Sequence, residues 1–215
     1  MKKIPVGILG ATGMVGQRFI SLLANHPWFE VVAVAASPRS VGKTIADLTI
    51  QAVEDDMEKI AQKARLVFSA LDMEKEDIRR IENAYAALGV VVISNNSAHR
   101  WTKDVPMIMP EINPDHLRLI DAQRKNHGWD RGFVVVKPNC SIQSYVPQIT
   151  ALMDFRPTKV LVTTFQAVSG AGKTLESWPE MNDNVIPFIE GEEEKSEKEP
   201  LKIWGVLRNG EIELA

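Results

Sequence analysis

The chain has 215 residues, of which 45% are hydrophobic and 25% charged, and its net charge is −3 at pH 7. This composition is typical of a globular protein with one large domain or slightly more. The slightly acidic balance excludes a basic surface for nucleic acid or anionic membranes. One cysteine cannot form an internal disulfide, so we expect a reducing cytoplasm. No apolar run reaches the ~20 residues that a membrane-spanning helix needs.

The first part of the chain alternates apolar runs with amphipathic patterns. Strands are predicted over residues 4–9, 31–36, 66–71 and 90–94, and helices over residues 14–25 and 74–88. In the second helix, Ile78, Ile81 and Tyr85 recur on one face, and Gly89 is expected to end it. Alternating strands and helices predict an α/β fold with a doubly wound parallel sheet and right-handed crossovers.

A glycine-rich turn separates the first predicted strand from the first predicted helix. Gly10, Gly13 and Gly16 have the spacing G-x-x-G-x-x-G, one residue looser than the common dinucleotide-binding pattern. Glycines permit a tight turn, and the helix N-terminus beyond it attracts a pyrophosphate. The alternative is a tight turn without a ligand. The strand–turn–helix context favours nucleotide binding.

The loop after the second predicted strand discriminates between the two nicotinamide dinucleotides. A binder of NAD usually has Asp or Glu there to hold the ribose hydroxyls. This chain instead has Ser37, Arg39, Ser40 and Lys43, and no acid. Hydroxyls with two cations suit a 2′-phosphate, so we predict NADP(H). A polar surface loop without a ligand is the alternative.

The character of the sequence changes after residue 133. Residues 158–172 alternate in the manner of a long, threonine-rich antiparallel strand. A loop containing Pro179 and Pro187 and then a charge-rich segment follow. We therefore predict a nucleotide-binding domain over residues 1–134 and part of a second domain over residues 135–215.

The single cysteine lies at the junction of an apolar run and a helical pattern. Cys140 follows residues 133–136, and Ile142 and Val146 begin the helical stripe after it. At a helix N-terminus the free backbone amides stabilise a thiolate, which favours a nucleophile. The alternative is an inert core cysteine. Pro147 is expected to kink the helix or to end its first segment.

Several motifs occur in order along the chain: GATGMVG, SPRSVGK, NNSAHR, MPEINPDH, PNCS, FQAVSGAGK and NVIPFIEGEEEK. Together they resemble aspartate-β-semialdehyde dehydrogenase, in particular its archaeal and fungal-like branch. The resemblance implies a Rossmann-type domain followed by the first part of an α+β catalytic and dimerisation domain. It also implies NADPH-dependent reductive dephosphorylation of L-4-aspartyl phosphate to L-aspartate 4-semialdehyde. That oxidoreductase step belongs to amino-acid biosynthesis: lysine, diaminopimelate, threonine and methionine.

The resemblance also assigns roles to individual residues. Cys140 is the nucleophile that forms a thioester, Asn139 orients the acyl group, and Gln166 holds the substrate. Arg100 and Lys195 are phosphate contacts, and Glu192 binds the substrate ammonium. The expected cofactor contacts are Gly10, Thr12, Gly13, Met14, Val15, Gly16, Ser37, Arg39, Ser40, Lys43, Ser69, Ala70, Ser169 and Gly170. No metal site is expected.

Each of these roles has a structural alternative. Arg100 suits a surface ion pair, and Gln166 suits an outward-facing strand position. The run EEEKSEKE suits a solvated helix face in which Glu194 pairs with Lys198.

The family's acid/base histidine and its carboxylate-binding arginine belong to a motif beyond the residues matched here. All four histidines of the chain, His26, His99, His116 and His127, are interpreted as structural or surface residues. The chain is therefore expected to be an N-terminal portion with little turnover. Family members are homodimers or homotetramers. Two alternative functions remain: a malonyl-CoA-type acyl-CoA reductase, and a non-catalytic NADP-binding module.

Overall fold

The computed structural model describes residues 2–215 and contains a seven-stranded sheet with the order β3-β4-β2-β1-β5-β6-β7. All neighbouring strands are parallel except β3 and β4. The strands are β1 (Ile4–Leu9), β2 (Phe29–Ala36), β3 (Thr44–Ile45), β4 (Leu48–Ala52), β5 (Leu66–Ser69), β6 (Val91–Ser94) and β7 (Phe133–Val136). The α/β prediction is confirmed.

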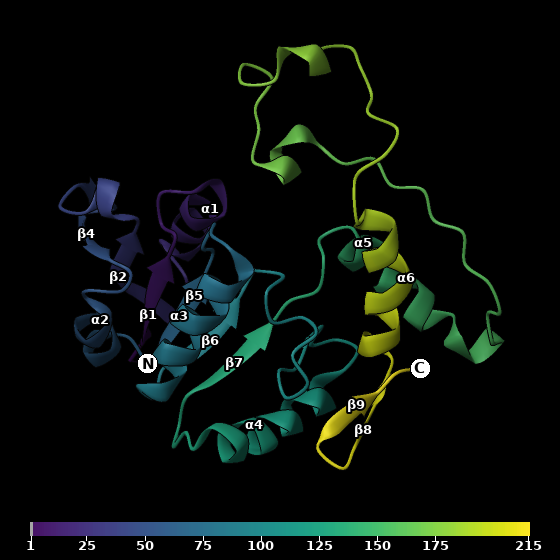
Figure 1. Ribbon diagram of the computed structural model, residues 1–215, viewed down its shortest axis with the longest axis horizontal. Coiled ribbons are helices and arrows are strands. Elements are labelled where there is room, and N and C mark those ends of the chain that lie inside the picture. Colours follow the sequence, from purple (N-terminus) through teal and green to yellow (C-terminus); the bar gives the residue numbers. More distant parts are fainter. Residues whose placement is uncertain (1) are drawn as a thin grey trace.

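Helices connect the parallel strands and cover both faces of the sheet (Figure 1). They are α1 (Met14–Leu23), α2 (Met57–Lys63), α3 (Lys75–Ala87) and α4 (Leu119–His127). Residues of β1 alternate between the two faces, as the period of a strand requires. Val6 and Ile8 belong to one buried cluster with Leu23 of α1, and Leu9 belongs to another with Ile60 and Ile81.

The predicted elements of this part are close to the observed ones. The range of β1 agrees with the prediction, and Gly89 follows α3 with a positive φ of 82°. The short elements β3, β4 and α2 were not predicted. None of the helices within residues 2–215 has the length and apolarity that crossing a bilayer requires.

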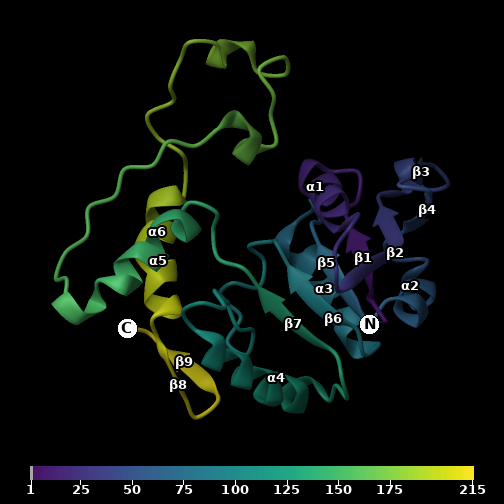
Figure 2. The same cartoon turned by 180° about the vertical axis from the view of Figure 1, so that it is seen from behind.

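Beyond β7 the chain forms α5 (Ile142–Ala151), α6 (Glu192–Ile203) and the hairpin of β8 (Val206–Arg208) and β9 (Glu211–Glu213). The helices α5 and α6 lie side by side in both views (Figures 1 and 2). Ile142, Val146 and Ile203 are buried in the same cluster as the sheet residues. Consequently α5 and α6 are anchored to the sheet through a shared core.

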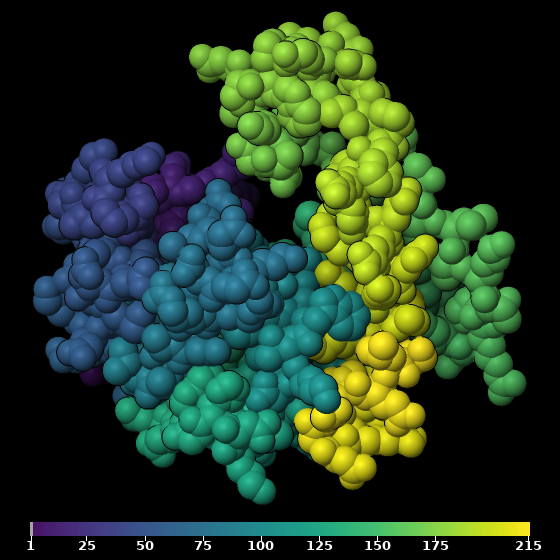
Figure 3. Space-filling view, in the orientation of Figure 1, coloured from purple at the N-terminus to yellow at the C-terminus, as the bar shows by residue number. Residues whose placement is uncertain are grey.

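One expectation for this region is wrong. Residues 158–172 form no strand; their only regular element is a 3-10 turn at Val168–Ala171. Leu161 and Phe165 are 87% and 90% exposed. An alternating pattern becomes a strand only beside a partner strand, and within residues 2–215 no strand pairs with this segment. Residues 152–191, between α5 and α6, instead project away from the rest of the molecule (Figure 3). This segment is called the excursion below.

Pro147 does not end α5. The helix continues to Ala151, where the Thr150 hydroxyl donates a hydrogen bond of 2.7 Å to the Val146 carbonyl. The Thr150 hydroxyl also accepts a hydrogen bond of 2.8 Å from the Trp204 indole after α6. Both contacts support the C-terminal half of the helix in spite of the proline.

Candidate active site

The turn between β1 and α1 requires two of its three glycines. Gly10 has a φ of +80°, and a Cβ there would lie 2.2 Å from the Ala70 carbonyl oxygen. A Cβ on Gly16 would lie 2.1 Å from the Gly10 carbonyl oxygen. Real Cβ atoms do not approach backbone that closely, so the turn packs against β5 and α1 only when both residues are glycine. Gly13 precedes the helix and leaves its N-terminus uncovered.

A cleft of about 660 Å³ lies at the carboxyl ends of the strands. It is centred where β1 has β2 on one side and β5 on the other, the topological switch point at which doubly wound sheets bind ligands. The residues that line it end or follow β1, β2, β4 and β5: Gly10, Thr12, Gly13, Ala36, Ser37, Pro38, Ala52, Val53, Glu54, Asp55, Ala70, Leu71, Asp72 and Met73, together with Ile81.

The predicted cofactor residues fall into three groups. Gly10, Thr12, Gly13, Ser37 and Ala70 line the cleft. Met14, Val15 and Gly16 form the first turn of α1, Arg39, Ser40 and Lys43 lie on the loop after β2, and Ser69 ends β5 as a buried residue. Ser169 and Gly170 lie in the excursion and do not line this cleft. The acids Glu54, Asp55 and Asp72 were not predicted from the sequence to line the cleft. Their positions just after β4 and β5 could have indicated it, because ligands bind at the carboxyl ends of parallel strands.

The nucleophile candidate occupies the turn from β7 to α5. Cys140 is exposed and is followed by Ser141, the N-cap of α5. The Asn139 side-chain oxygen accepts hydrogen bonds from the Ser141 amide (2.8 Å) and hydroxyl (2.6 Å). The buried Asn139 therefore holds the start of the helix and leaves the sulfur of Cys140 accessible beside the N-terminal amides.

The Glu192 carboxylate gathers the predicted substrate residues into one cluster. It accepts hydrogen bonds from Asn139 Nδ2 (3.1 and 3.2 Å), from Gln166 Nε2 (3.0 Å) and from Lys195 Nζ. Burial raises the pKa of Glu192, but hydrogen bonds from Lys195 and then Gln166 outweigh it, and the pKa lies below its usual value. The carboxylate is therefore ionised at neutral pH and suits an ammonium partner.

Arg100 is buried rather than on the surface, which excludes its surface ion-pair alternative. Its Nη1 donates to Glu199 Oε1 (3.0 Å), and its Nε donates to the Lys137 carbonyl oxygen (3.2 Å). The other Glu199 oxygen accepts a hydrogen bond from the Asn139 amide (2.7 Å). One carboxylate, itself 1% exposed, thus joins the arginine to the nucleophile turn.

Lys202 also binds α6 to the segment that contains Arg100. Its Nζ donates to the carbonyl oxygens of Arg100 (2.6 Å) and Val105 (3.2 Å). Burial lowers the pKa of Lys202 to about 8. Glu199 and Lys202 were missed from the sequence. For Glu199 the spacing from Glu192 was a usable signal, because seven residues are nearly two helical turns and place both carboxylates on one face.

The histidines make contacts elsewhere: His26 with main-chain amides after α1, His99 with Thr102, His116 with Asn113 and the Gly205 carbonyl, and His127 with Asp104. None of these contacts involves Cys140. The His99 ring is buried opposite the Glu82 carboxylate, 3.8 Å away. Burial lowers the pKa of His99 to about 4, so its ring is neutral at pH 7, and burial raises the pKa of Glu82 above its usual value.

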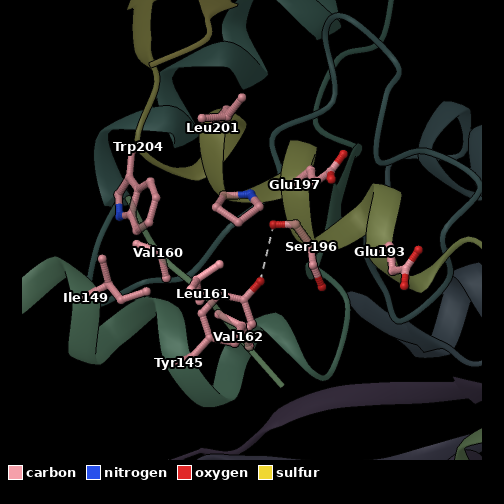
Figure 4. Close-up of a pocket in the computed structure, with 11 residues that line it drawn as sticks. Tyr145, Ile149, Val160, Leu161, Val162, Glu193, Ser196, Glu197, Leu201 and Trp204 are labelled. Carbon is pink, nitrogen blue, oxygen red and sulfur yellow. Dashed lines mark hydrogen bonds between the residues drawn. The ribbon is translucent and has the colours of Figure 1, made fainter. Parts of the chain in front are cut away.

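A separate apolar groove of about 360 Å³ lies between α5, α6 and residues 160–162 (Figure 4). Tyr145, Ile149, Leu201 and Trp204 form much of its wall, and the Tyr145 hydroxyl donates to the Ser196 carbonyl oxygen (3.3 Å). The α6 residues that line it form a different stripe from Glu192 and Glu199. The groove is therefore distinct from the cluster around the cysteine.

Comparisons with known proteins match two sequence models to the chain. The sequence model described as "Semialdehyde dehydrogenase, NAD binding domain" matches residues 5–120, and "Semialdehyde dehydrogenase, dimerisation domain" matches residues 149–215. Aspartate-semialdehyde dehydrogenase from Archaeoglobus fulgidus is 46% identical over 98% of this chain and 64% of that protein. The protein of the same name from Schizosaccharomyces pombe is 40% identical over 95% of this chain and 61% of that protein.

Solved structures are similar as well. The crystal structure of aspartate semialdehyde dehydrogenase with NADP from Candida albicans superposes with a TM-score of 0.82 at 34% identity, over 99% of this chain and 64% of that chain. A Vibrio cholerae enzyme, aspartate semialdehyde dehydrogenase II complexed with ASA, gives a TM-score of 0.57 at 26% identity, over 71% and 48%. The chain thus spans less than two thirds of these relatives.

Proposed function

The chain belongs to the semialdehyde dehydrogenase family, and from this we propose that it performs the chemistry of an aspartate-semialdehyde dehydrogenase. The proposed reaction is the NADPH-dependent reductive dephosphorylation of L-4-aspartyl phosphate to L-aspartate 4-semialdehyde. The observation that carries the proposal is the exposed Cys140 at the start of α5, beside Asn139, Gln166, Glu192 and Lys195 joined by hydrogen bonds.

We propose NADP(H) as the cofactor because the cleft fits a dinucleotide. The turn at Gly10 and Gly16 has no room for a side chain, and the N-terminus of α1 opens beside it, as a pyrophosphate requires. Arg39 is exposed on the loop after β2, where a 2′-phosphate would lie. When bound, NADPH supplies the hydride that reduces the acyl group.

In the proposed first step, the Cys140 sulfur attacks the acyl carbon of the substrate. The C–S bond forms, the C–O bond to phosphate breaks, and phosphate leaves with the electron pair. Glu192 pairs with the substrate ammonium, and Asn139 and Gln166 orient the acyl group. After reduction of the thioester, collapse of the thiohemiacetal returns the sulfur anion and releases the aldehyde.

We further propose that the 215-residue chain by itself turns over slowly. None of its four histidines forms a hydrogen bond with Cys140, and a general base typically contributes about 10²–10⁴ to a rate. The domain division at residues 134 and 135 and assembly as a homodimer or homotetramer remain predictions. The family's dimerisation-domain match to residues 149–215 supports self-association.

The experiment that tests this function identifies the leaving group in a single turnover. The chain is mixed with NADPH and either aspartyl phosphate or malonyl-CoA, and released phosphate or CoA is measured alongside NADPH oxidation. We expect phosphate release from aspartyl phosphate that is stoichiometric with the chain and absent in Cys140→Ser. CoA release would instead make the protein an acyl-CoA reductase. NADPH binding without either release would make it a non-catalytic NADP-binding module.

A further inference from the structure

Lys137 lies between β7 and the turn that carries Cys140, and its backbone position is fixed. Its amide donates to the Ser94 carbonyl oxygen (3.1 Å), which extends the pairing of β7 with β6 by one residue. Its carbonyl oxygen accepts the hydrogen bond from Arg100 Nε (3.2 Å). Lys137 is therefore held at the carboxyl edge of the sheet, directly before the nucleophile turn.

The Lys137 side chain folds back over that turn. Its Nζ donates to the Pro138 carbonyl oxygen (3.1 Å), and Gln143 Nε2 donates to the same oxygen at 3.1 Å from the first turn of α5. An ammonium group has three hydrogen-bond donors, and this contact uses one of them. The half-buried Lys137 therefore holds its ammonium group against the turn that carries Cys140, with two N–H donors free of this contact.

The other cations of the site are already neutralised by carboxylates. Arg100 pairs with Glu199 (3.0 Å), and Lys195 pairs with Glu192. Among residues 2–215, Lys137 forms no ion pair with a carboxylate. Arg100 is also only 6% exposed, with two of its nitrogens engaged. Lys137 is thus the cation at this turn that has no carboxylate partner and is available to interact with a ligand or with the Cys140 sulfur.

The charges around Lys137 include the sulfur of Cys140. Burial lowers the pKa of Lys137 and the positive charge of Arg100 lowers it further, whereas the Cys140 thiolate and then Glu199 act in the opposite direction. An ammonium group on Lys137 and a sulfur anion on Cys140 attract each other electrostatically.

We propose that Lys137 is an anion-contacting residue of the active site, which stabilises the Cys140 thiolate and then contacts the phosphoryl group of the acyl phosphate. The phosphoryl part rests on the proposed function; the thiolate part does not. A dianionic phosphoryl group at the sulfur can accept hydrogen bonds from the two free N–H donors of Lys137. Arg100 already donates from two nitrogens, so it must either break its bond to Glu199 or donate from its one remaining nitrogen.

The test compares two alkylating reagents on the single cysteine of the chain. Iodoacetate is anionic and iodoacetamide is neutral, so the ratio of their rates reports positive charge at the sulfur. In Lys137→Gln we expect this ratio to fall about three- to tenfold at low salt, as loss of one nearby charge predicts. Lys137→Arg should restore it. The matched control Lys198→Gln, an exposed lysine on α6, should leave it unchanged.

Inorganic phosphate provides the second arm of the experiment. It should protect wild-type Cys140 against iodoacetamide and protect Lys137→Gln less. An unchanged reagent ratio in Lys137→Gln, or an equal fall in Lys198→Gln, overturns the thiolate contact. Equal phosphate protection in wild type and Lys137→Gln overturns the phosphoryl contact. Neither arm uses aspartyl phosphate or NADPH, so failure of the proposed dehydrogenase reaction is recognised separately.

Discussion

Replacing Glu199 with alanine removes the carboxylate that joins Arg100 to the nucleophile turn. In the native protein this group is 1% exposed and accepts hydrogen bonds from Arg100 Nη1 (3.0 Å) and from the Asn139 amide (2.7 Å). Glu199→Ala leaves a buried guanidinium without its counterion. Removing one partner of a buried ion pair costs about 3–5 kcal/mol, because the other charge stays desolvated.

The orphaned Asn139 amide adds to this cost, although the two contributions share one carboxylate and do not simply sum. We therefore expect Glu199→Ala to lower the free energy of unfolding by about 3–5 kcal/mol. At about 2–4 °C per kcal/mol for a protein of this size, the melting temperature should fall by roughly 6–20 °C. Urea denaturation followed by circular dichroism measures the first quantity, and a thermal scan measures the second.

Glu197→Ala is the matched control, because Glu197 lies on the same helix but is exposed. A surface substitution of this kind should change the free energy of unfolding by no more than about 0.5 kcal/mol. If Glu199→Ala and Glu197→Ala lose similar stability, Glu199 does not hold the site together. A loss under about 1 kcal/mol in Glu199→Ala would contradict the buried ion pair as well.

Three further predictions concern the cofactor cleft and the buried acid of α3. Arg39→Glu should weaken NADPH binding far more than NADH binding in fluorescence titrations, with Arg118→Glu as a charge-matched control; equal weakening of both cofactors removes the 2′-phosphate assignment. Gly16→Ala should abolish NADPH binding, because its Cβ would lie 2.1 Å from a carbonyl oxygen, and a normal affinity would contradict the packing of this turn. Burial raises the pKa of Glu82 above 4.5, so the folded state holds a proton that the unfolded state releases, and native stability falls as pH rises above that value. The stability of Glu82→Gln relative to wild type should therefore increase as the pH rises above about 4.5, and a pH-independent difference in urea denaturation would refute this.

The nucleotide-binding half could be predicted from the sequence because each of its main strands and helices carries its own periodic signal. Residues 4–9 alternate faces between two cores, and the pattern alone located that strand to the residue. The predicted strand at residues 158–172 failed for the opposite reason. Its threonine-rich alternation indicates a strand only where another strand supplies hydrogen bonds, and no single segment can reveal its partner.

The hairpin at the end of the chain was also overlooked, although its turn has a strong local signal. Asn209 and Gly210 both have positive φ, at 51° and 80°, as a two-residue type I′ turn requires. No structural prediction was made from the sequence for this segment.

Part of the candidate site could also be predicted from the sequence. Motif resemblance selected Asn139, Gln166, Glu192 and Lys195, which the fold joins in one hydrogen-bonded cluster. Resemblance could not identify Glu199 or Lys137, because a charged residue on a helix or after a strand is usually solvated. Only the packing of α6 against the nucleophile turn shows that Glu199 is buried.

The most direct test of the account is to look for an acyl group on Cys140. The chain is incubated with aspartyl phosphate without NADPH, quenched in acid, and measured by intact-mass spectrometry and peptide mapping. We predict an aspartyl thioester on the peptide containing Cys140, which disappears when NADPH is added and is absent in Cys140→Ser. An unmodified Cys140 in folded protein with bound substrate, or an adduct on another residue, would contradict the assignment of this sulfur as the nucleophile.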